Sequence, residues 1–140
     1  MKYLLDTCVV SELVKLKPNP GVTKWLEGCD EEALFLSVLT IGDIQKGISR
    51  LDKTPRRETL QQWLDSDLRA RFGDRLLPIT EEVCTTWGVL LGEAERAGTP
   101  IPTIDGLIAA TAVTHNLTIV TRTEKDFASA SVRVVNPWPR

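Results

Sequence analysis

Four aspartates lie in sequence motifs where a carboxylate could bind a cation or take part in catalysis. They are Asp6 in YLLDTCVV, Asp43 in TIGDIQKG, Asp105 in DGLIAATA and Asp126 in TRTEKDF. Ionised carboxylates are expensive to bury without a partner. Two of them ~5 Å apart repel by ~3 kcal/mol at an effective dielectric constant of about 20. If these side chains meet, protons or cations have to neutralise them.

The types of donor available in the chain indicate which cation that would be. Oxygen ligands without a Cys and His set suit Mg²⁺ or Mn²⁺. Magnesium typically takes one or two carboxylates and leaves its other positions to water and phosphate oxygens. This donor set is typical of metal-assisted phosphodiester hydrolysis. The single histidine, His115, ends a predicted helix, where we expect a dipole-capping or surface role.

Each aspartate also has a simpler explanation when it is taken alone. Asp is a strong N-cap residue, which suits Asp6 and does not exclude metal binding. Asp105 suits the first turn of a helix, Asp43 an exposed helix surface, and Asp126 a turn. The four are informative because of their order along the chain and their places relative to the predicted elements.

Those elements alternate between short apolar runs and longer helical patterns. The runs predict strands at 2–5, 33–37, 75–79, 117–121 and 131–135, and the helical patterns lie at 8–15, 21–28, 39–51, 55–72, 80–98 and 103–115. Strands separated by helices predict an α/β fold with a parallel sheet covered on both faces. Functional groups gather beyond the carboxyl ends of such strands. All four aspartates follow a predicted strand or begin a predicted helix, so we expect them at one edge of the sheet.

Composition bounds the class of protein. The chain has 140 residues, of which 42% are hydrophobic and 26% charged, as is ordinary for one globular domain spanning 1–140. No apolar run approaches the ~20 residues that span a bilayer, and the apolar run before Asp6 is too short for a signal peptide. Three widely spaced cysteines without a CxxC motif predict reduced core thiols. We therefore expect a cytoplasmic protein with no membrane contact.

The charge is unevenly distributed. The net charge is −2, but residues 46–75 hold eight basic and five acidic side chains. A solvated pair of amphipathic helices explains this pattern. An acidic chain can also present a basic face to nucleic acid. On that second interpretation, the side chains predicted to line a phosphate path are Arg56, Arg57, Arg69 and Arg71.

Five segments together resemble the PIN-domain family, especially the VapC-like toxins of toxin–antitoxin pairs and their FitB-like branch. They are LLDTCVVSEL, TIGDIQKGI, DGLIAATA, VTRTEKDF and the NPW near the C-terminus. The resemblance implies a three-layer α/β/α sandwich around a parallel sheet. It also implies a Mg²⁺- or Mn²⁺-dependent endoribonuclease that acts on structured RNA such as tRNA, rRNA or mRNA. Family members are commonly homodimers, and a cognate antitoxin inserts a segment into the active-site groove.

Residue by residue, the resemblance assigns the metal-binding acids to Asp6, Asp43 and Asp105. It places supporting hydroxyls at Thr7, Thr40 and Thr123, of which Thr123 stands where the family often has Asp or Asn. Asp126, Glu124 or neither compensates for that change, and we favour Asp126.

Two further departures concern residues beside the acids. Cys8 stands where Asn is common, so we expect Thr7 to supply a hydrogen bond that Asn would otherwise make. Asp43 replaces the more usual Glu and has a reach shorter by one methylene, so a water-mediated contact with the cation is an alternative to a direct one.

Other functions remain open at this point. A PIN-type nuclease of RNA maturation or of branched DNA would use the same residues. A catalytically degenerate PIN fold would only bind partners, since fold does not fix function. A phosphoacceptor receiver domain has similar length and pattern, but it carries paired acids after its first strand, where this chain has Asp6 and Thr7.

Overall fold

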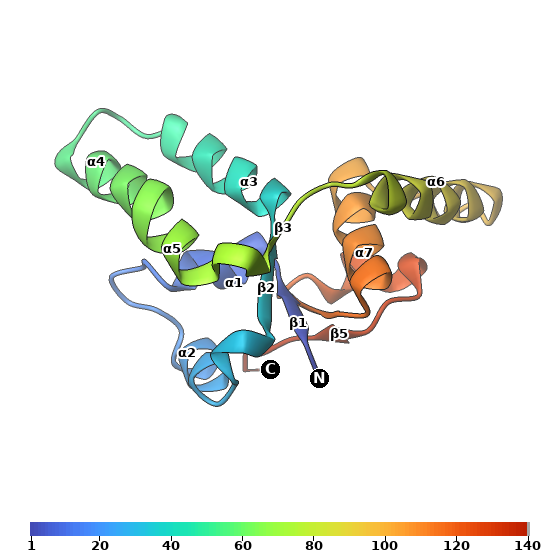
Figure 1. Ribbon diagram of the computed structural model, residues 1–140, viewed down its shortest axis with the longest axis horizontal. Helices are drawn as coiled ribbons and strands as arrows, with labels where there is room; N and C mark the ends of the chain where they lie inside the picture. The colour runs from blue at the N-terminus through green and yellow to red at the C-terminus, as the bar shows by residue number, and fades with distance from the viewer. Residues whose placement is uncertain (140) are drawn as a thin grey trace.

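A five-stranded parallel sheet forms the centre of the molecule (Figure 1). The computed structural model describes residues 1–139. In chain order the strands are β1 (Tyr3–Leu5), β2 (Leu34–Ser37), β3 (Leu76–Leu77), β4 (Thr118–Val120) and β5 (Val134–Val135). They lie in the order β3-β2-β1-β4-β5, and every neighbouring pair is parallel. The predicted parallel α/β fold is confirmed.

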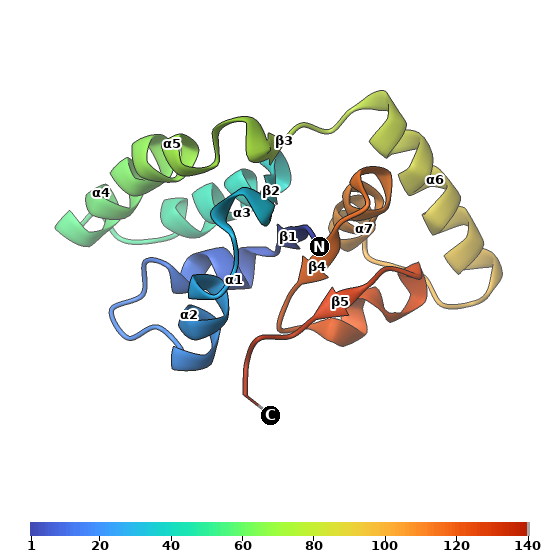
Figure 2. The same cartoon turned by 60° about the horizontal axis from the view of Figure 1, so that its bottom comes forward.

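Helices cover both faces of this sheet, as Figures 1 and 2 show. One face carries α1 (Thr7–Glu12), α2 (Pro20–Glu27), α3 (Val38–Ser49), α4 (Pro55–Gln62) and α5 (Arg69–Phe72). The other face carries α6 (Glu81–Arg96), α7 (Thr103–His115) and the 3-10 segment η4 (Glu124–Ala130). Two shorter 3-10 segments, η1 (Glu31–Ala33) and η3 (Gly73–Arg75), precede β2 and β3. The result is the expected three-layer α/β/α sandwich.

Strand β1 divides the core into two. Successive side chains of a strand point to opposite faces, and both Leu4 and Leu5 are fully buried. Leu5 packs with α1–α5, whereas Leu4 packs with α6, α7 and η4. Because β1 is buried from both sides, the residue that follows it, Asp6, is held by a rigid element.

The long helix predicted at 55–72 is not continuous α-helix. A π-helical segment, η2 (Trp63–Leu68), separates α4 from α5. Within it Leu64 and Leu68, four residues apart, are both buried, as they would also be on one face of an α-helix. Periodicity of apolar residues does not distinguish a π turn from an α turn at this length.

The cysteines are free, as expected, but one of them is not a core thiol. Cys8 and Cys29 are half-buried, and Cys84 is exposed on α6. Val83 beside it faces the core, and the next residue lies ~100° further round the helix. Over residues 1–139, none of the helices combines the length and the apolar character needed to cross a bilayer.

Candidate active site

Asp6 lies at the carboxyl end of the central strand β1 and caps helix α1. Its Oδ1 accepts a hydrogen bond of 2.9 Å from the backbone N–H of Thr7, which is the N-cap role expected from sequence. Its own N–H donates to the carbonyl of Val120 at the end of β4, at 3.0 Å. The backbone and one carboxylate oxygen are therefore fixed by two different elements.

The second oxygen of Asp6 is held by a residue that sequence reasoning missed. The Oγ1 hydroxyl of Thr121 donates to Asp6 Oδ2 at 2.8 Å. Thr121 follows β4, the strand paired with β1, and is fully buried. The signal in the sequence was its position directly after the apolar run LTIV, which is equivalent to the position of Asp6 after β1.

Thr7 has a different role from the expected one. Its hydroxyl donates to Asp43 Oδ2 at 3.1 Å, so it joins α1 to α3. Its backbone N–H, and not its side chain, binds Asp6. Asp43 is exposed on the second turn of α3, one turn after Thr40. The Thr40 side chain is buried, and its hydroxyl has no hydrogen-bond partner within residues 1–139.

Asp105 lies in the first turn of α7, on the opposite side of the sheet. The helix is packed closely there: a Cβ on Gly106 would lie 2.4 Å from Cδ1 of Leu91 on α6. Asp126 lies in η4, which follows β4, and its N–H donates to the Thr123 carbonyl at 3.0 Å. Three of the predicted acids therefore follow the neighbouring strands β1, β2 and β4, and the fourth lies at the start of helix α7.

The electrostatics of these carboxylates show that they share one region. Burial raises the pKa of Asp6; hydrogen bonds from Thr121 and Thr7 oppose this, and the charges of Asp43 and Asp126 add to it. Burial also raises the pKa of Asp105, with contributions from Asp126, Asp6 and Asp43. In the described part of the chain, none of the four forms an ion pair with Lys, Arg or His. The structure therefore brings negative charges together without a cationic side chain to neutralise them.

The donor set fits a hard divalent cation that is bound largely through water. The side chains near Asp6 that could bind a cation are carboxylates and hydroxyls, and the Thr40 hydroxyl has no hydrogen-bond partner within residues 1–139. No three His, Cys, Asp or Glu side chains of residues 1–139 come close enough together to enclose a metal ion. Mg²⁺ typically binds one or two carboxylates and keeps several waters, so it does not require such a cage.

The raised pKa values predict how stability depends on pH when no metal is added. A carboxyl group whose pKa is raised by folding contributes stability at low pH, and this contribution is lost as pH rises through the folded-state pKa. Asparagine cannot ionise. We expect Asp105→Asn to have a higher Tm than the wild-type protein near pH 7, by a margin that shrinks towards pH 4. Thermal unfolding in chelator-treated buffer measures this, with Asp52→Asn, on an exposed loop, as the control. A margin independent of pH would contradict it.

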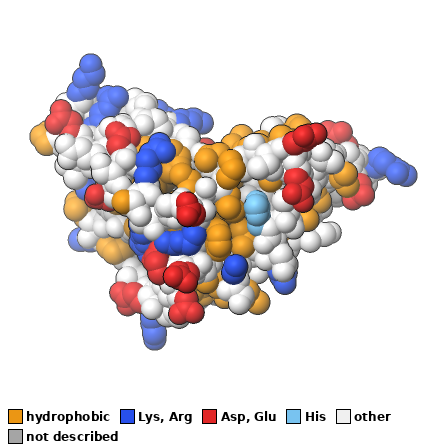
Figure 3. Space-filling view, viewed as in Figure 1, with side chains coloured by type: hydrophobic (Ala, Val, Ile, Leu, Met, Phe, Trp, Pro, Cys, Tyr) orange, Lys and Arg blue, Asp and Glu red, His pale blue; other side chains and the backbone are white. Residues whose placement is uncertain are grey.

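The four arginines predicted to line a phosphate path lie in different places. Arg56 Nη2 donates to the Val14 carbonyl at 2.6 Å, and its side chain lines a groove that also contains Thr7 and Asp43. Arg57 Nη1 donates to the Leu51 carbonyl at 3.0 Å. Arg69 is exposed on α5. In the space-filling view, basic side chains gather at the tip where α4 begins (Figure 3).

Arg71 forms an ion pair within the protein. Its guanidinium binds both carboxylate oxygens of Glu31, with its shortest contact at 2.8 Å. Glu31 precedes β2, whereas the acids follow the strands, so Arg71 lies towards the opposite edge of the sheet. The pairing joins segments 40 residues apart, which charge counting along the chain does not reveal.

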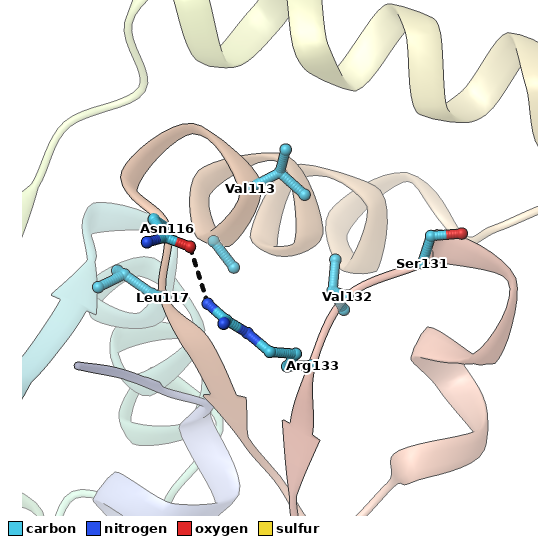
Figure 4. Close-up of a pocket in the computed structure, with 7 residues that line it drawn as sticks. Val113, Asn116, Leu117, Ser131, Val132 and Arg133 are labelled. Atoms are coloured by element: carbon cyan, nitrogen blue, oxygen red, sulfur yellow. Dashed lines mark hydrogen bonds between the residues drawn. The ribbon is translucent and has the colours of Figure 1, made fainter. Parts of the chain in front are cut away.

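Two pockets in the structure help to locate the active site. The groove beside Asp43, of about 370 Å³, runs between α1, α3 and α4 with Ile44, Ile48 and Leu51 among its apolar lining residues. A smaller pocket of about 190 Å³ lies between the end of α7 and the start of β5 (Figure 4). There Arg133 donates to Asn116 Oδ1 at 2.8 Å, and no acidic side chain lines it. The carboxyl-end edge of the sheet is therefore the candidate active site.

Comparison with known proteins identifies the family of this chain. Residues 3–132 match the PIN domain family. The chain is 36% identical to Toxin FitB of Neisseria gonorrhoeae, over 96% of this chain and 97% of FitB. It is 33% identical to VapC ribonuclease Y4jK of Sinorhizobium fredii, over 96% of each chain. The crystal structure of FitAcB from Neisseria gonorrhoeae superposes with a TM-score of 0.92 at 35% identity, covering 99% of each chain. The chain belongs to the PIN-domain family, and within that family it resembles the FitB and VapC toxins.

Proposed function

We propose that this protein is an endoribonuclease toxin of a toxin–antitoxin pair that hydrolyses phosphodiester bonds of structured RNA with Mg²⁺ or Mn²⁺ in the cytoplasm. The observation that carries the proposal is the group of four carboxylates at one sheet edge, which lack a cationic partner within residues 1–139. Burial and the charges of the neighbouring acids raise the pKa of two of them, Asp6 and Asp105. Relatives of similar length are named a toxin and a VapC ribonuclease.

Asp6 and Asp105 are the residues we propose to hold the cation, because burial and neighbouring acids destabilise their ionised forms most clearly. A divalent cation bound there would neutralise the carboxylates, stabilise charge on the phosphate and lower the pKa of a coordinated water. Asp43 is shorter than Glu, and the Thr7 hydroxyl orients its carboxylate. We assign Asp43 to the same cation, directly or through water.

The remaining groups have supporting roles in this proposal. The unpaired Thr40 hydroxyl is available to bind a water at the site. Asp126 supplies the fourth negative charge, and we propose its carboxylate as the acceptor of a proton from the attacking water. Arg56, beside the groove, is the arginine best placed to contact an RNA phosphate.

We propose that the groove next to Asp43 is the binding site of an antitoxin segment. Its floor is apolar, it reaches Thr7 and Asp43, and Lys15 and Arg56 line it with polar groups. A bound apolar segment would cover the approach to the acids and exclude RNA.

We also propose that the protein forms a homodimer. Val89 on α6 and Ile104 on α7 are exposed apolar side chains available to that interface.

Substitution of an exposed groove residue tests the antitoxin proposal. Leu51 lines the groove and is 42% exposed. We expect Leu51→Glu to weaken binding of the antitoxin, taken as the product of the reading frame immediately upstream, at least about tenfold, because burying a charge is costly. Titration calorimetry measures the affinity.

The matched control is Leu16→Glu, at an exposed leucine that does not line the groove. Equal affinity of both variants for the antitoxin would place its binding surface elsewhere.

A further inference from the structure

The Thr121 hydroxyl is the centre of a small polar cluster beside Asp6. It lies 2.8 Å from Asp6 Oδ2, 3.1 Å from Thr123 Oγ1 and 3.7 Å from Cys8 Sγ, and it accepts from the Thr123 N–H at 3.2 Å. Thr121 is fully buried, and its N–H donates to the Val135 carbonyl at 3.0 Å. The sheet therefore fixes where this hydroxyl lies.

The direction of the hydrogen bonds follows from counting protons. A hydroxyl has one proton and two lone pairs. The carboxylate of Asp6 is an acceptor only, so the Thr121 proton is used for Asp6. The Thr123 hydroxyl, which lies beside Thr121, then has to donate to it. The N–H and the hydroxyl of Thr123 then occupy both lone pairs of the Thr121 oxygen, so the Cys8 thiol is left to donate to Asp6 Oδ2, 4.0 Å away. Neutral donors are thus directed towards one carboxylate oxygen.

We propose that Thr121 is the positioning residue for Asp6, and that Thr123 supports it by donating to the Thr121 hydroxyl. This inference rests on the proposed function, in which Asp6 binds a divalent cation. One oxygen of Asp6 is held by the Thr7 N–H and the other by Thr121, so the plane of the carboxylate is fixed. Because both donors are uncharged, they orient the carboxylate and leave its charge available to the cation.

Two of the three departures from the family pattern, Cys8 and Thr123, are explained by the same cluster. The side chains of Cys8 and Thr123 both contact the Thr121 hydroxyl, although the two residues lie far apart in the sequence. Neither is needed as a ligand: the Cys8 side chain fills the space near Asp6, and Thr123 orients the hydroxyl that binds Asp6. Thr123 is therefore a member of the site without being a substitute for the fourth acid.

The test measures cation binding directly, because groups that orient a metal ligand typically change metal affinity by ~10–100-fold when they are mutated. We expect Thr121→Val to weaken Mn²⁺ binding, followed by electron paramagnetic resonance, at least ~10-fold. Thr121→Ser keeps the hydroxyl and should stay within about threefold of wild type. The matched control is Thr118→Val on β4, the strand that Thr121 follows, where a buried hydroxyl lacks a hydrogen-bond partner in the described structure. Thr118→Val should bind Mn²⁺ like the wild-type protein.

A second measurement needs no metal. In chelator-treated buffer we expect Thr121→Val to lower Tm by about 5 °C in the wild-type background. In an Asp6→Ala background the decrease should be less than about 2 °C, because the carboxylate that accepts from Thr121 is then absent. Equal decreases, or unchanged Mn²⁺ affinity in Thr121→Val when the wild-type protein binds Mn²⁺, would overturn the inference. A third outcome is that Thr121→Val lowers Tm less in the Asp6→Ala background but the wild-type protein binds no Mn²⁺. This would contradict the proposed function and would still show that Thr121 holds Asp6.

Discussion

Replacing Asp6 with Asn is expected to lower kcat/KM for RNA hydrolysis by about 10²–10³-fold, with little change in folding. The amide has no charge with which to hold a cation, and losing one preorganised electrostatic group at a reaction centre typically costs 10²–10³-fold. Asn still presents a carbonyl oxygen to the Thr7 N–H or the Thr121 hydroxyl, and it is as good an N-cap as Asp. Asp105→Asn is expected to cause a loss of similar size. Initial rates of cleavage of a structured RNA, with Tm for each variant, measure both effects.

The control for these variants is Asp30→Asn. Asp30 is exposed, precedes η1 at the opposite edge of the sheet, and makes no capping hydrogen bond with its side chain. Its substitution should leave kcat/KM within about twofold of wild type. Full activity in Asp6→Asn and Asp105→Asn would exclude these residues as metal ligands of the reaction. Absence of cleavage by the wild-type protein would favour a PIN fold that only binds partners.

Removal of divalent cations is expected to abolish RNA hydrolysis and to lower Tm. Folding raises the pKa of Asp6 and Asp105 because it buries them near other acids, so ionisation at neutral pH costs the folded state stability. A cation that binds only the folded protein offsets this cost, by ~2.7 kcal/mol when its concentration is 100 times Kd. EDTA should therefore stop cleavage and reverse the rise in Tm, and added Mg²⁺ or Mn²⁺ should restore both.

Asp105→Asn separates this effect from general binding of cations to an acidic chain. The variant should show little or no rise in Tm with Mn²⁺, whereas Asp30→Asn should respond like the wild-type protein. Cleavage that persists in excess EDTA, or an equal rise in Tm for Asp105→Asn, would contradict a metal site at these residues.

The fold was largely readable from the sequence because its elements are short and strongly patterned. Strand β1 and helix α7 were predicted almost to the residue, since an apolar run and a capped periodic segment define them locally. The π segment at Trp63–Leu68 was not predicted, because it preserves the spacing of buried leucines that an α-helix would also give. Local patterns predict an element more reliably than its internal geometry.

The site was predictable as far as it depends on the ends of strands. Parallel strands bring their carboxyl ends together, so Asp6, Asp43 and Asp126 were expected at one edge and lie there. The contacts of Thr121 and Arg71 were not predictable, because each depends on a partner far along the chain. Sequence order gave no reason to pair Thr121 with Asp6, or Arg71 with Glu31.

The most direct test of the account is sequencing of RNA ends in cells after induced expression of the wild-type chain or of Asp6→Asn. We predict new ends at a few discrete positions in structured RNA for the wild-type chain, accompanied by growth arrest, and none of these ends for Asp6→Asn. The same new ends with both chains, or no new ends with either, would contradict a ribonuclease whose activity depends on the carboxylate at the end of β1.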